Sequence, residues 1–434
     1  MGGMTETTAR TDAPAPAGEA SPAAGLPGAT EPGYDVTTPL DIDYYEAFAD
    51  LPAADRAVWE RARAAATAVQ AEFVAAWDRH EYPVAAAAGL GRHGLFNDGL
   101  DHPELERFSP LATGLVNMEL SRVDGSLGTV LAVQGGLALR TLVYFGSEEQ
   151  QRQYVGPLAR GEVLGAFALT EPDHGSDSAG LETRATRTER GWVLRGAKKW
   201  IGNGASGGIT FVWARVEDPG AGGGGAGDHG AVRCFLVPQD TRGYRGEVIA
   251  GKGALRAIDQ AVITLDDVEL PAEALLPGAR TFKDASRVLY ATRAGVAWSA
   301  LGHATACFES ALAYATQRVQ FGKRLAQHQL VQERLTRMLS QLVSMQLYCV
   351  GLADLEAAGR LRPTQASLAK YHNTRTARAI AAEARDLLGG NGILLEHGVI
   401  RHQADIEAIH TYEGTESVQA LLIGRDLTGY GAFA

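Results

Sequence analysis

The chain has few cysteines, no long apolar runs and no excess of positive charge. Its 434 residues include three cysteines, Cys234, Cys307 and Cys349. The number is odd and the spacing suits neither a zinc site nor an iron–sulfur cluster, so we expect reduced, free thiols and no metal. Acidic side chains number 51 against 40 basic ones, which gives a net charge of −11. This balance argues against nucleic acid or an anionic membrane as a main partner.

The sequence also shows no pattern typical of a membrane helix or of a secretory signal. No uninterrupted apolar stretch reaches the roughly twenty residues that a membrane helix needs. The N-terminus has no basic segment leading into an apolar one, as a secretory signal would. Residues 1–39 are instead rich in Ala, Pro, Gly, Thr and Glu. They bury too little apolar surface to offset chain entropy, so we expect a disordered tail on a soluble, cytoplasmic protein.

The rest of the chain divides into three regions. Hydrophobic residues make up 45% of the sequence, enough for a large core. From 40 to 165 apolar residues recur at helical spacing, as at Leu111, Leu115 and Met118. From 166 to 280 short β-branched and aromatic runs alternate with Gly, Pro and Asp, which indicates strands. The glycine-rich stretch 219–230 inside this region favours a flexible hairpin loop, because neither a helix nor a lysine follows it as in a phosphate cradle.

From 281 to 434 helical spacing returns and strand signals disappear. Helices are expected over 285–317, 326–358, 364–388 and 416–427. The whole pattern predicts an α+β chain: an N-terminal helical domain, a middle β-domain and a C-terminal helical bundle. A functional site is expected where the three regions meet.

The strongest candidate for chemistry is Glu413, within Thr411–Thr415. A glutamate beside glycine in a loop is more often a solvated residue or a helix cap. Here the apolar neighbours Ile409 and Tyr412 favour burial, which raises the pKa of a carboxyl group toward the range of a general base. Gly414 leaves the backbone open to a substrate carbonyl. Glu413 is therefore our candidate for removing a proton from carbon.

Three further segments carry polar, aromatic or basic groups that suit a flavin. The loop Thr170–Asp177 offers hydroxyls and amides, although a turn or N-cap uses the same residues. Trp200, beside Ile201 and Gly202, is either a core residue or a wall for a planar ring. Arg318, in Arg318–Gly322, is either a surface charge or a two-pronged donor to a pyrophosphate. Their order in one chain favours the flavin.

The sequence and order of these segments resemble those of the acyl-CoA dehydrogenase superfamily, from about residue 38 to 433. Within it, the chain is most similar to glutaryl-CoA dehydrogenases and plant-type short-chain acyl-CoA oxidases. The resemblance implies an N-terminal helical domain, a middle β-domain, a C-terminal four-helix bundle, non-covalent FAD and a homotetramer. The segments that carry it are Leu169–Asp173, Trp200–Asn203, Arg318–Gly322, Asp386–Gly392 and Thr411–Thr415.

The resemblance also implies a role for each matching residue. Glu413 would remove the α-proton of an acyl-CoA, while its main-chain N–H and a ribityl hydroxyl bind the thioester carbonyl and the β-hydride passes to flavin N5. The implied flavin-ring contacts are Phe167, Leu169, Thr170, Ser176, Trp200, Ile201 and Gly202. The implied dinucleotide contacts, partly across a subunit boundary, are Arg318, Phe321, Gln329, Asp386, Gly389, Gly390, Thr415 and Ser417. The implied acyl-CoA contacts are Gly128, Ser176, Thr292, Arg293 and Gly414.

Three positions depart from the family pattern. His174 stands where a small residue is usual, and Gly202 replaces a threonine whose hydroxyl often reaches the flavin. Gly128 stands where glutaryl-CoA dehydrogenases carry an arginine for the distal carboxylate, and we expect it to leave room for a bulkier or longer acyl tail. The sequence therefore predicts dehydrogenation of a neutral short-chain acyl-CoA to a trans-2-enoyl-CoA, without decarboxylation.

Several alternatives stay open at this level. The flavin could be reoxidised by O2, as in an oxidase, or by an electron-transfer flavoprotein. The acyl group could be carried by a carrier protein, or the substrate could be glutaryl-CoA after all. A non-catalytic flavin-binding paralogue is disfavoured by the presence of Glu413.

Overall fold

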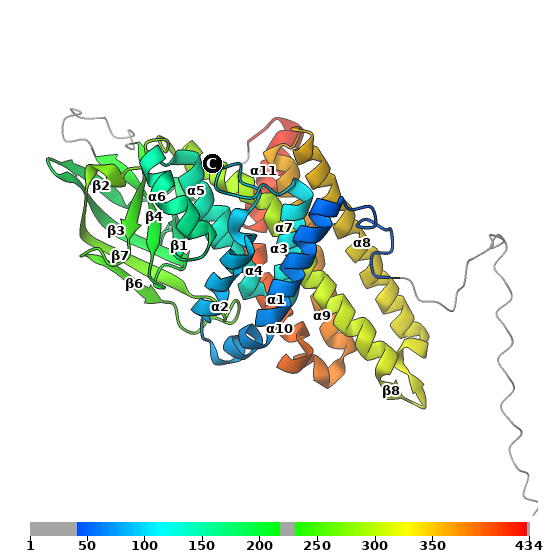
Figure 1. The fold of residues 1–434 in the computed structure, drawn as a ribbon. Coiled ribbons are helices and arrows are strands. Elements are labelled where there is room, and N and C mark those ends of the chain that lie inside the picture. The colour runs from blue at the N-terminus through cyan, green and yellow to red at the C-terminus, as the bar shows by residue number, and fades with distance from the viewer. Residues whose placement is uncertain (1–40, 218–230, 432–434) are drawn as a thin grey trace, which may run out of the picture. The chain divides into compact units, whose positions relative to one another are not determined.

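The computed structural model describes residues 41–217 and 231–431. The tail expected at 1–39 and the hairpin loop expected at 219–230 lie outside the described residues. From Ile42 onward the chain forms one compact unit. Figure 1 shows its helices and strands in chain order.

The N-terminal part is helical, and polar caps mark where its helices begin. Ser109 accepts a hydrogen bond from the Ala112 N–H at the start of α3, and Pro110 occupies the first helical position. Ser147 and Gln150 form a reciprocal capping box at the start of α6. The longer elements are α1 (Ala53–Arg79), α2 (Val84–Gly89), α3 (Pro110–Val123), α4 (Gly125–Leu131), the π-helix η3 (Ala132–Leu139), α5 (Arg140–Phe145) and α6 (Glu148–Ala159).

The middle part is a sheet whose described strands run in the order β1-β4-β2-β3-β7-β6, with β5 also paired to β4. Strand β4 pairs in parallel with β1 and β2, whereas the other pairs are antiparallel. The strands are β1 (Gly165–Ala168), β2 (Arg184–Thr188), β3 (Gly191–Gly202), β4 (Ile209–Glu217), β5 (Val232–Pro238), β6 (Tyr244–Val248) and β7 (Gln260–Leu270).

Strand β3 is irregular at its C-terminal end. Its register against β7 shifts between Lys198 and Ile201. Trp200, inside this bulge, has a φ of 65°, a conformation that an aromatic residue adopts rarely. The bulge leaves its indole 55% exposed, while Ile201 returns to the core. Trp200 is therefore a surface aromatic residue whose position is set by a β-bulge in the pairing of β3 with β7.

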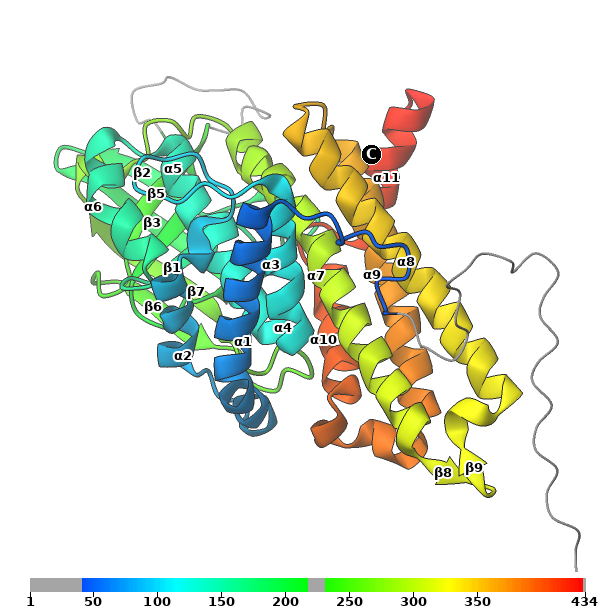
Figure 2. The ribbon, with the colours of Figure 1, turned by 45° about the vertical axis from the view of Figure 1, so that its right-hand side comes forward.

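The C-terminal part consists of long helices that pack along one another (Figure 2). They are α7 (Phe282–Gln317), α8 (Gln329–Ala357), α9 (Pro363–Leu387), α10 (Val399–Thr411) and α11 (Glu416–Thr428). Sequence analysis missed α10, because its apolar residues are separated by charged and histidine side chains. The expected absence of strands was also wrong: β8 (Val319–Gln320) and β9 (Lys323–Arg324) form a hairpin whose turn residues Phe321 and Gly322 both have positive φ.

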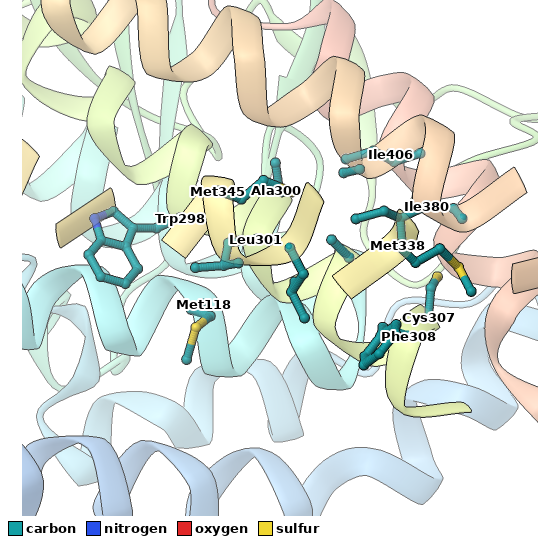
Figure 3. Packing of buried hydrophobic residues seen from close by; sticks show 14 of the residues in the cluster. Met118, Trp298, Ala300, Leu301, Cys307, Phe308, Met338, Met345, Ile380 and Ile406 are labelled. Atoms are coloured by element: carbon teal, nitrogen blue, oxygen red, sulfur yellow. The ribbon is translucent and has the colours of Figure 1, made fainter. Parts of the chain in front are cut away.

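The largest core cluster lies among the C-terminal helices and α3 (Figure 3). Leu301 and Cys307 of α7 are fully buried beside Met338 of α8 and Ile380 of α9. Ile406 shows that α10, although missed, supplies part of this core. All three cysteines are free and buried, as expected for small core residues.

Two helical stretches are long and apolar enough, by length and composition, to cross a membrane. They are residues Gly125–Phe145 and Gln329–Ala357, and the expectation of no such stretch was therefore too strict. The first is 83% buried inside the protein, as a core helix is, and the second is 44% buried. The absence of a membrane partner stays a prediction.

Candidate active site

Glu413 sits in the short loop between α10 and α11, in a strained backbone conformation. Its φ is 52°, and that of Gly414 is 86°. The carboxylate accepts a hydrogen bond of 3.0 Å from the Thr292 hydroxyl of α7. Burial raises the pKa of Glu413, and the charge of Lys370 and the Thr292 hydrogen bond oppose that rise. The result is a partly buried carboxylate whose pKa is raised in the direction that suits a general base.

Two buried side chains donate hydrogen bonds to the backbone carbonyls of this loop. Lys370 of α9 donates to the carbonyls of Tyr412 and Gly414. Gln419 of α11 donates to the carbonyls of Glu413, at 3.1 Å, and Gly414, at 2.9 Å. Both side chains are at most 1% exposed. A β-carbon at position 414 would come within 2.6 Å of the Gln419 amide, so the loop needs glycine there.

A cavity of about 480 Å³ opens in front of the loop. Glu413 and Thr292 line it together with Tyr412 and Trp298. Small residues on α3, α4, η3 and α7 form part of the lining. These are Gly114, Gly128, Ala132, Gly136 and Gly295. A short acyl chain fits a space of this size beside the carboxylate.

Gly128 lines the cavity, but it does not open it in the way we expected. A β-carbon at Gly128 would lie 2.1 Å from the Ser121 hydroxyl oxygen. That hydroxyl is itself held 2.7 Å from the Ser299 hydroxyl. The expected room for a longer tail at this position was therefore wrong, since Ser121 already fills it.

Arg293, one residue after Thr292, is buried beneath the loop. It donates to the Ser367 hydroxyl at 2.9 Å and lies over the Tyr290 ring. Burial lowers its pKa, and the charge of Glu413 opposes this. Its Nε has no hydrogen-bond partner within the described chain. A buried, unpaired donor close to the carboxylate suits a site completed by a ligand.

The expected flavin residues gather at the ends of β1 and β3 and in the loop after β1. Phe167 and Leu169 pack their side chains into the core, so only their backbone can face a ring. Ser176 and Trp200 are exposed, and a β-carbon at Gly175 would meet nothing within 4 Å. These residues form an open polar edge beside an exposed aromatic side chain.

The π-helix η3 links this edge to the cavity. Val133 lies against Gly202, where an added β-carbon would come within 2.7 Å of its methyl group. Three residues further on, Gly136 lies against the Thr292 methyl, 3.2 Å from an added β-carbon. The same helical turn therefore touches the candidate flavin strand and the residue that hydrogen-bonds Glu413. π-helical segments occur often at functional sites.

The expected dinucleotide residues are not brought to that edge. Arg318, Phe321 and Gln329 are exposed around the β8–β9 hairpin, at the far end of α7 from the sheet (Figure 1). Gly389 and Gly390 are exposed at the end of α9, and Asp386 is paired with Arg334 at 2.7 Å. A further pair lies at the start of α11, where Thr415 caps the helix and Ser417 is exposed. Within one chain the residues thus form separate groups.

Two other carboxylates of the expected site segments, Glu171 and Glu416, have other partners. Glu171 forms a buried ion pair of 2.8 Å with Lys198 and accepts the N–H groups of Glu182 and Thr183. Glu416 pairs with Arg375 and lies 3.0 Å from His410. Neither lines the cavity.

Sequence reasoning missed Lys370 and Gln419. A signal for the lysine existed: it shares a helical face with Ala366, Asn373 and Ala377, all buried, so it interrupts an apolar stripe. A charged residue in such a stripe is usually paired with something specific. Gln419 left no comparable signal, because glutamine in a helix is ordinary.

An isolated carboxylate at the end of an acyl-sized cavity, beside a polar edge with an exposed tryptophan, is the arrangement of a flavin enzyme that removes protons from carbon. Comparison with known proteins identifies the class. Descriptions of acyl-CoA dehydrogenase match over the N-terminal domain at 52–162, the middle domain at 166–268 and the C-terminal domain at 282–428. The chain belongs to the acyl-CoA dehydrogenase family.

Individual relatives agree. An acyl-CoA dehydrogenase of Bacillus subtilis is 33% identical over 356 residues, covering 80% of this chain and 91% of the relative. The short-chain specific acyl-CoA dehydrogenase of Bos taurus mitochondria is 32% identical over 359 residues, covering 80% and 83%. Each of these relatives therefore matches this chain over most of the length of both proteins.

Solved structures show the same fold. Glutaryl-CoA dehydrogenase of Mycobacterium smegmatis superposes with a TM-score of 0.85 at 38% identity, covering 91% of this chain and 99% of its own. Butyryl-CoA dehydrogenase of Megasphaera elsdenii gives 0.81 at 28%, covering 87% and 99%. A chain described as electron transferring flavoprotein of Acidaminococcus fermentans gives 0.81 at 26%, covering 87% and 99%.

FAD is the cofactor of this family. A second structure of a Mycobacterium smegmatis glutaryl-CoA dehydrogenase is a complex with FADH2. It is 36% identical to this chain and superposes with a TM-score of 0.85, covering 90% of this chain and 98% of its own. The residues present fit that group. Trp200 is an exposed aromatic next to the open backbone of Gly175 and Ser176, which suits the flavin ring. The expected domain limits at 39/40, 165/166 and 280/281 stay predictions, as do the individual cofactor contacts.

Proposed function

We propose that the protein removes two hydrogens from a neutral, short-chain acyl-CoA and forms a trans-2-enoyl-CoA. The observation that carries this proposal is the Glu413 carboxylate, fixed by Thr292 where the loop meets the cavity. The short-chain and butyryl-CoA relatives support the chain length.

Glu413 takes the α-proton, and the electron pair of the broken C–H bond forms the new double bond. FAD, held by the residues around Trp200, supplies the acceptor for the hydride that leaves the β-carbon. The Glu413 main-chain N–H binds the thioester carbonyl, which makes the α-proton more acidic. Within the described chain this N–H has no other hydrogen-bond partner. No proton is needed from solvent for the forward step.

The cavity supports a neutral acyl group. Its acidic residues Asp98 and Glu356 would repel a second carboxylate on the substrate. Its buried arginine, Arg140, is already bound to Asp98 at 2.6 Å. Arg107 also lines the cavity, but its side chain is 72% exposed and lies 3.4 Å from Asp101. Arg122 is bound to Glu119 and Glu309, and Arg92 does not line the cavity. Glutaryl-CoA is therefore the weaker candidate, despite the structural likeness to its dehydrogenase.

We propose an electron-transfer flavoprotein as the partner that reoxidises the flavin. This choice rests only on the family and on one similar structure, whose description names an electron transferring flavoprotein; O2 stays the alternative acceptor. A homotetramer stays part of the proposal: Phe321 is 95% exposed at the tip of the β8–β9 hairpin, as expected for an apolar residue that is covered by another subunit.

The test is anaerobic mixing of the FAD-loaded protein with butyryl-CoA. We expect the flavin absorbance to bleach and crotonyl-CoA to appear. Glu413→Gln should retain FAD but lose a hundred- to ten-thousandfold in rate, roughly the contribution of a general base. Glu407→Gln, an exposed residue of α10 paired with Arg378, is the matched control and should react like the wild type. Bleaching of Glu413→Gln at the wild-type rate would reject Glu413 as the base.

A further inference from the structure

Lys370 is a buried lysine whose hydrogen bonds all concern the Glu413 loop. It is 1% exposed, and its ammonium group donates to the carbonyls on either side of Glu413, those of Tyr412 and Gly414. It forms no direct ion pair within the described residues. An ammonium group buried without a carboxylate partner is costly, so the position calls for a functional reason.

The Tyr412 carbonyl and the Glu413 N–H belong to the same peptide unit. That unit is trans, since none of the described peptide bonds is cis. In a trans peptide the C=O and N–H point in opposite directions. Lys370 draws the carbonyl toward α9, so the N–H must point the other way, toward the cavity lined by Glu413. This orientation also requires the unusual positive φ of Glu413.

We propose that Lys370 is a positioning residue that turns the Glu413 peptide so that its N–H faces the substrate carbonyl. This inference rests on the proposed function. The positive charge acts on the same peptide: it polarises the C=O and strengthens the N–H as a donor. Gln419 fixes the next carbonyl, that of Glu413, so the two side chains together set the loop.

The charges around Lys370 are consistent with this role. Glu413 faces it from the loop, Arg293 from α7 and His410 from α10. Burial lowers the pKa of Lys370 to about 7, the charge of Glu413 raises it and that of Arg293 lowers it. The charge of Glu413 thus favours the protonated lysine, and the charge of the lysine favours the ionised carboxylate, each against the effect of burial. The pair supports its own ionised state.

The test compares two ligands that differ only in the carbonyl: butyryl-CoA and its thioether analogue S-butyl-CoA. Binding is measured by calorimetry on the FAD-loaded Glu413→Gln protein, in which butyryl-CoA binds without reacting. Without the Glu413 charge, Lys370 still has N–H donors for both carbonyls, because a neutral amine carries two and an ammonium group three. The Glu413→Gln protein is combined with Lys370→Met, with Lys370→Gln, or with Lys252→Met. Lys252 is the matched control. It is a mostly buried lysine that also donates hydrogen bonds to two backbone carbonyls, those of Leu255 and Ile258, but it makes no hydrogen bond to the Glu413 loop in the described part of the chain.

We expect the Glu413→Gln protein to prefer butyryl-CoA over the thioether by roughly three- to tenfold, the net contribution of about one hydrogen bond to a ground-state carbonyl. Lys370→Met should remove most of that preference, with the remainder expected from the ribityl hydroxyl of FAD, and Lys370→Gln should fall between. Lys252→Met should lower thermal stability and leave the preference unchanged. A purely structural role for Lys370 would weaken both ligands alike, which would leave the ratio intact and overturn the inference.

The design separates this inference from the proposed function. If the Glu413→Gln protein still oxidises butyryl-CoA, the proposed base is wrong. If the Glu413→Gln protein does not oxidise butyryl-CoA, but the variants with Lys370→Met or Lys370→Gln keep the full carbonyl preference, only the role proposed for Lys370 is wrong.

Discussion

Thr292 and Glu413 are 121 residues apart in the chain, yet the Thr292 hydroxyl lies 3.0 Å from the Glu413 carboxylate. The hydroxyl donates, so the bond favours the ionised carboxylate over the neutral acid. Thr292 is 7% exposed, so water cannot easily replace it. The relationship joins α7 to the loop before α11 and makes Thr292 one of the groups, with Lys370 and Arg293, that lower the pKa of the base against the effect of burial.

We therefore expect Thr292→Val to raise the pKa of Glu413. A base works only when ionised, so the acid side of the kcat/KM profile should move to higher pH, and activity should be lost first at low pH. A hydrogen bond to a charged group is worth about 1.5–3 kcal/mol, so the shift should be roughly one to two pH units. The pH profile of flavin reduction measures it. Thr292→Ser keeps the donor and should keep the profile; an unmoved acid limb in the valine variant would contradict the prediction.

A second prediction concerns the buried pair Glu171–Lys198, which lies under the candidate flavin loop. Lys198 is fully buried, and burial lowers its pKa to about 8 while Glu171 raises it. Glu171→Gln leaves the ammonium unpaired and should destabilise the fold by about 3 kcal/mol near pH 7. Without Glu171 the folded pKa of Lys198 lies below the value of about 8 that it has in the intact pair. The variant therefore releases the buried proton at lower pH than the wild type, and its stability deficit shrinks as pH rises toward about 8.

Chemical unfolding at pH 7 and pH 9 measures this difference. The deficit of Glu171→Gln should be smaller at pH 9, because the buried lysine is then neutral. The double variant Glu171→Gln with Lys198→Met should recover part of the loss at both pH values. An equal deficit at pH 7 and pH 9 would show that the charge of Lys198 is not the cause.

Much of this fold could be predicted from periodicity and turn residues. Leu111, Leu115 and Met118 do lie on the helix α3, and the run Phe211–Ala214 does lie on the strand β4. α10 could not be predicted, because its buried face includes Arg401, His402 and Asp405, which look like surface residues until their buried partners are known.

The candidate site was predictable only in part. Glu413 could be picked out because it stands alone beside glycine. Lys370 could not be assigned, since its role depends on backbone carbonyls 42 and 44 residues away, and carbonyls leave no mark in a sequence. The space around Gly128 depends on the rotamer of Ser121, which the sequence does not encode locally.

Assembly gives a third prediction. Arg318 is exposed beside Phe321, and neither can reach the flavin edge of its own chain, so we expect them to serve FAD in another subunit. Arg318→Ala should then weaken both FAD retention and the tetramer, because each stabilises the other. Sizing chromatography with FAD absorbance, with and without added FAD, measures this. Arg324→Ala on the same hairpin is the control; an FAD-replete tetramer of unchanged stability in Arg318→Ala would contradict the prediction.

The last prediction concerns the substrate. A glutaryl group would bring a second carboxylate into a cavity that Glu356 lines and whose arginines, Arg140 and Arg107, already lie beside Asp98 and Asp101. Burying that charge without a partner of its own costs several kcal/mol. We expect kcat/KM for butyryl-CoA to exceed that for glutaryl-CoA by about a hundredfold or more, since each 1.36 kcal/mol is a factor of ten. Crotonyl-CoA and CO2 are measured with both substrates. Efficient release of CO2 from glutaryl-CoA would contradict the prediction.

Engineered arginine tests the same argument from the other side. Gly128→Arg alone should destabilise the protein, because an added β-carbon already meets the Ser121 hydroxyl at 2.1 Å. Combined with Ser121→Gly, which removes that hydroxyl, the arginine has space and can pair with a distal carboxylate. We expect the double variant to bind glutaryl-CoA more tightly than Ser121→Gly alone, and butyryl-CoA more weakly. If the arginine changes neither affinity, the cavity at Gly128 is not where the acyl tail ends, and the substrate must be reassigned from another wall of the cavity.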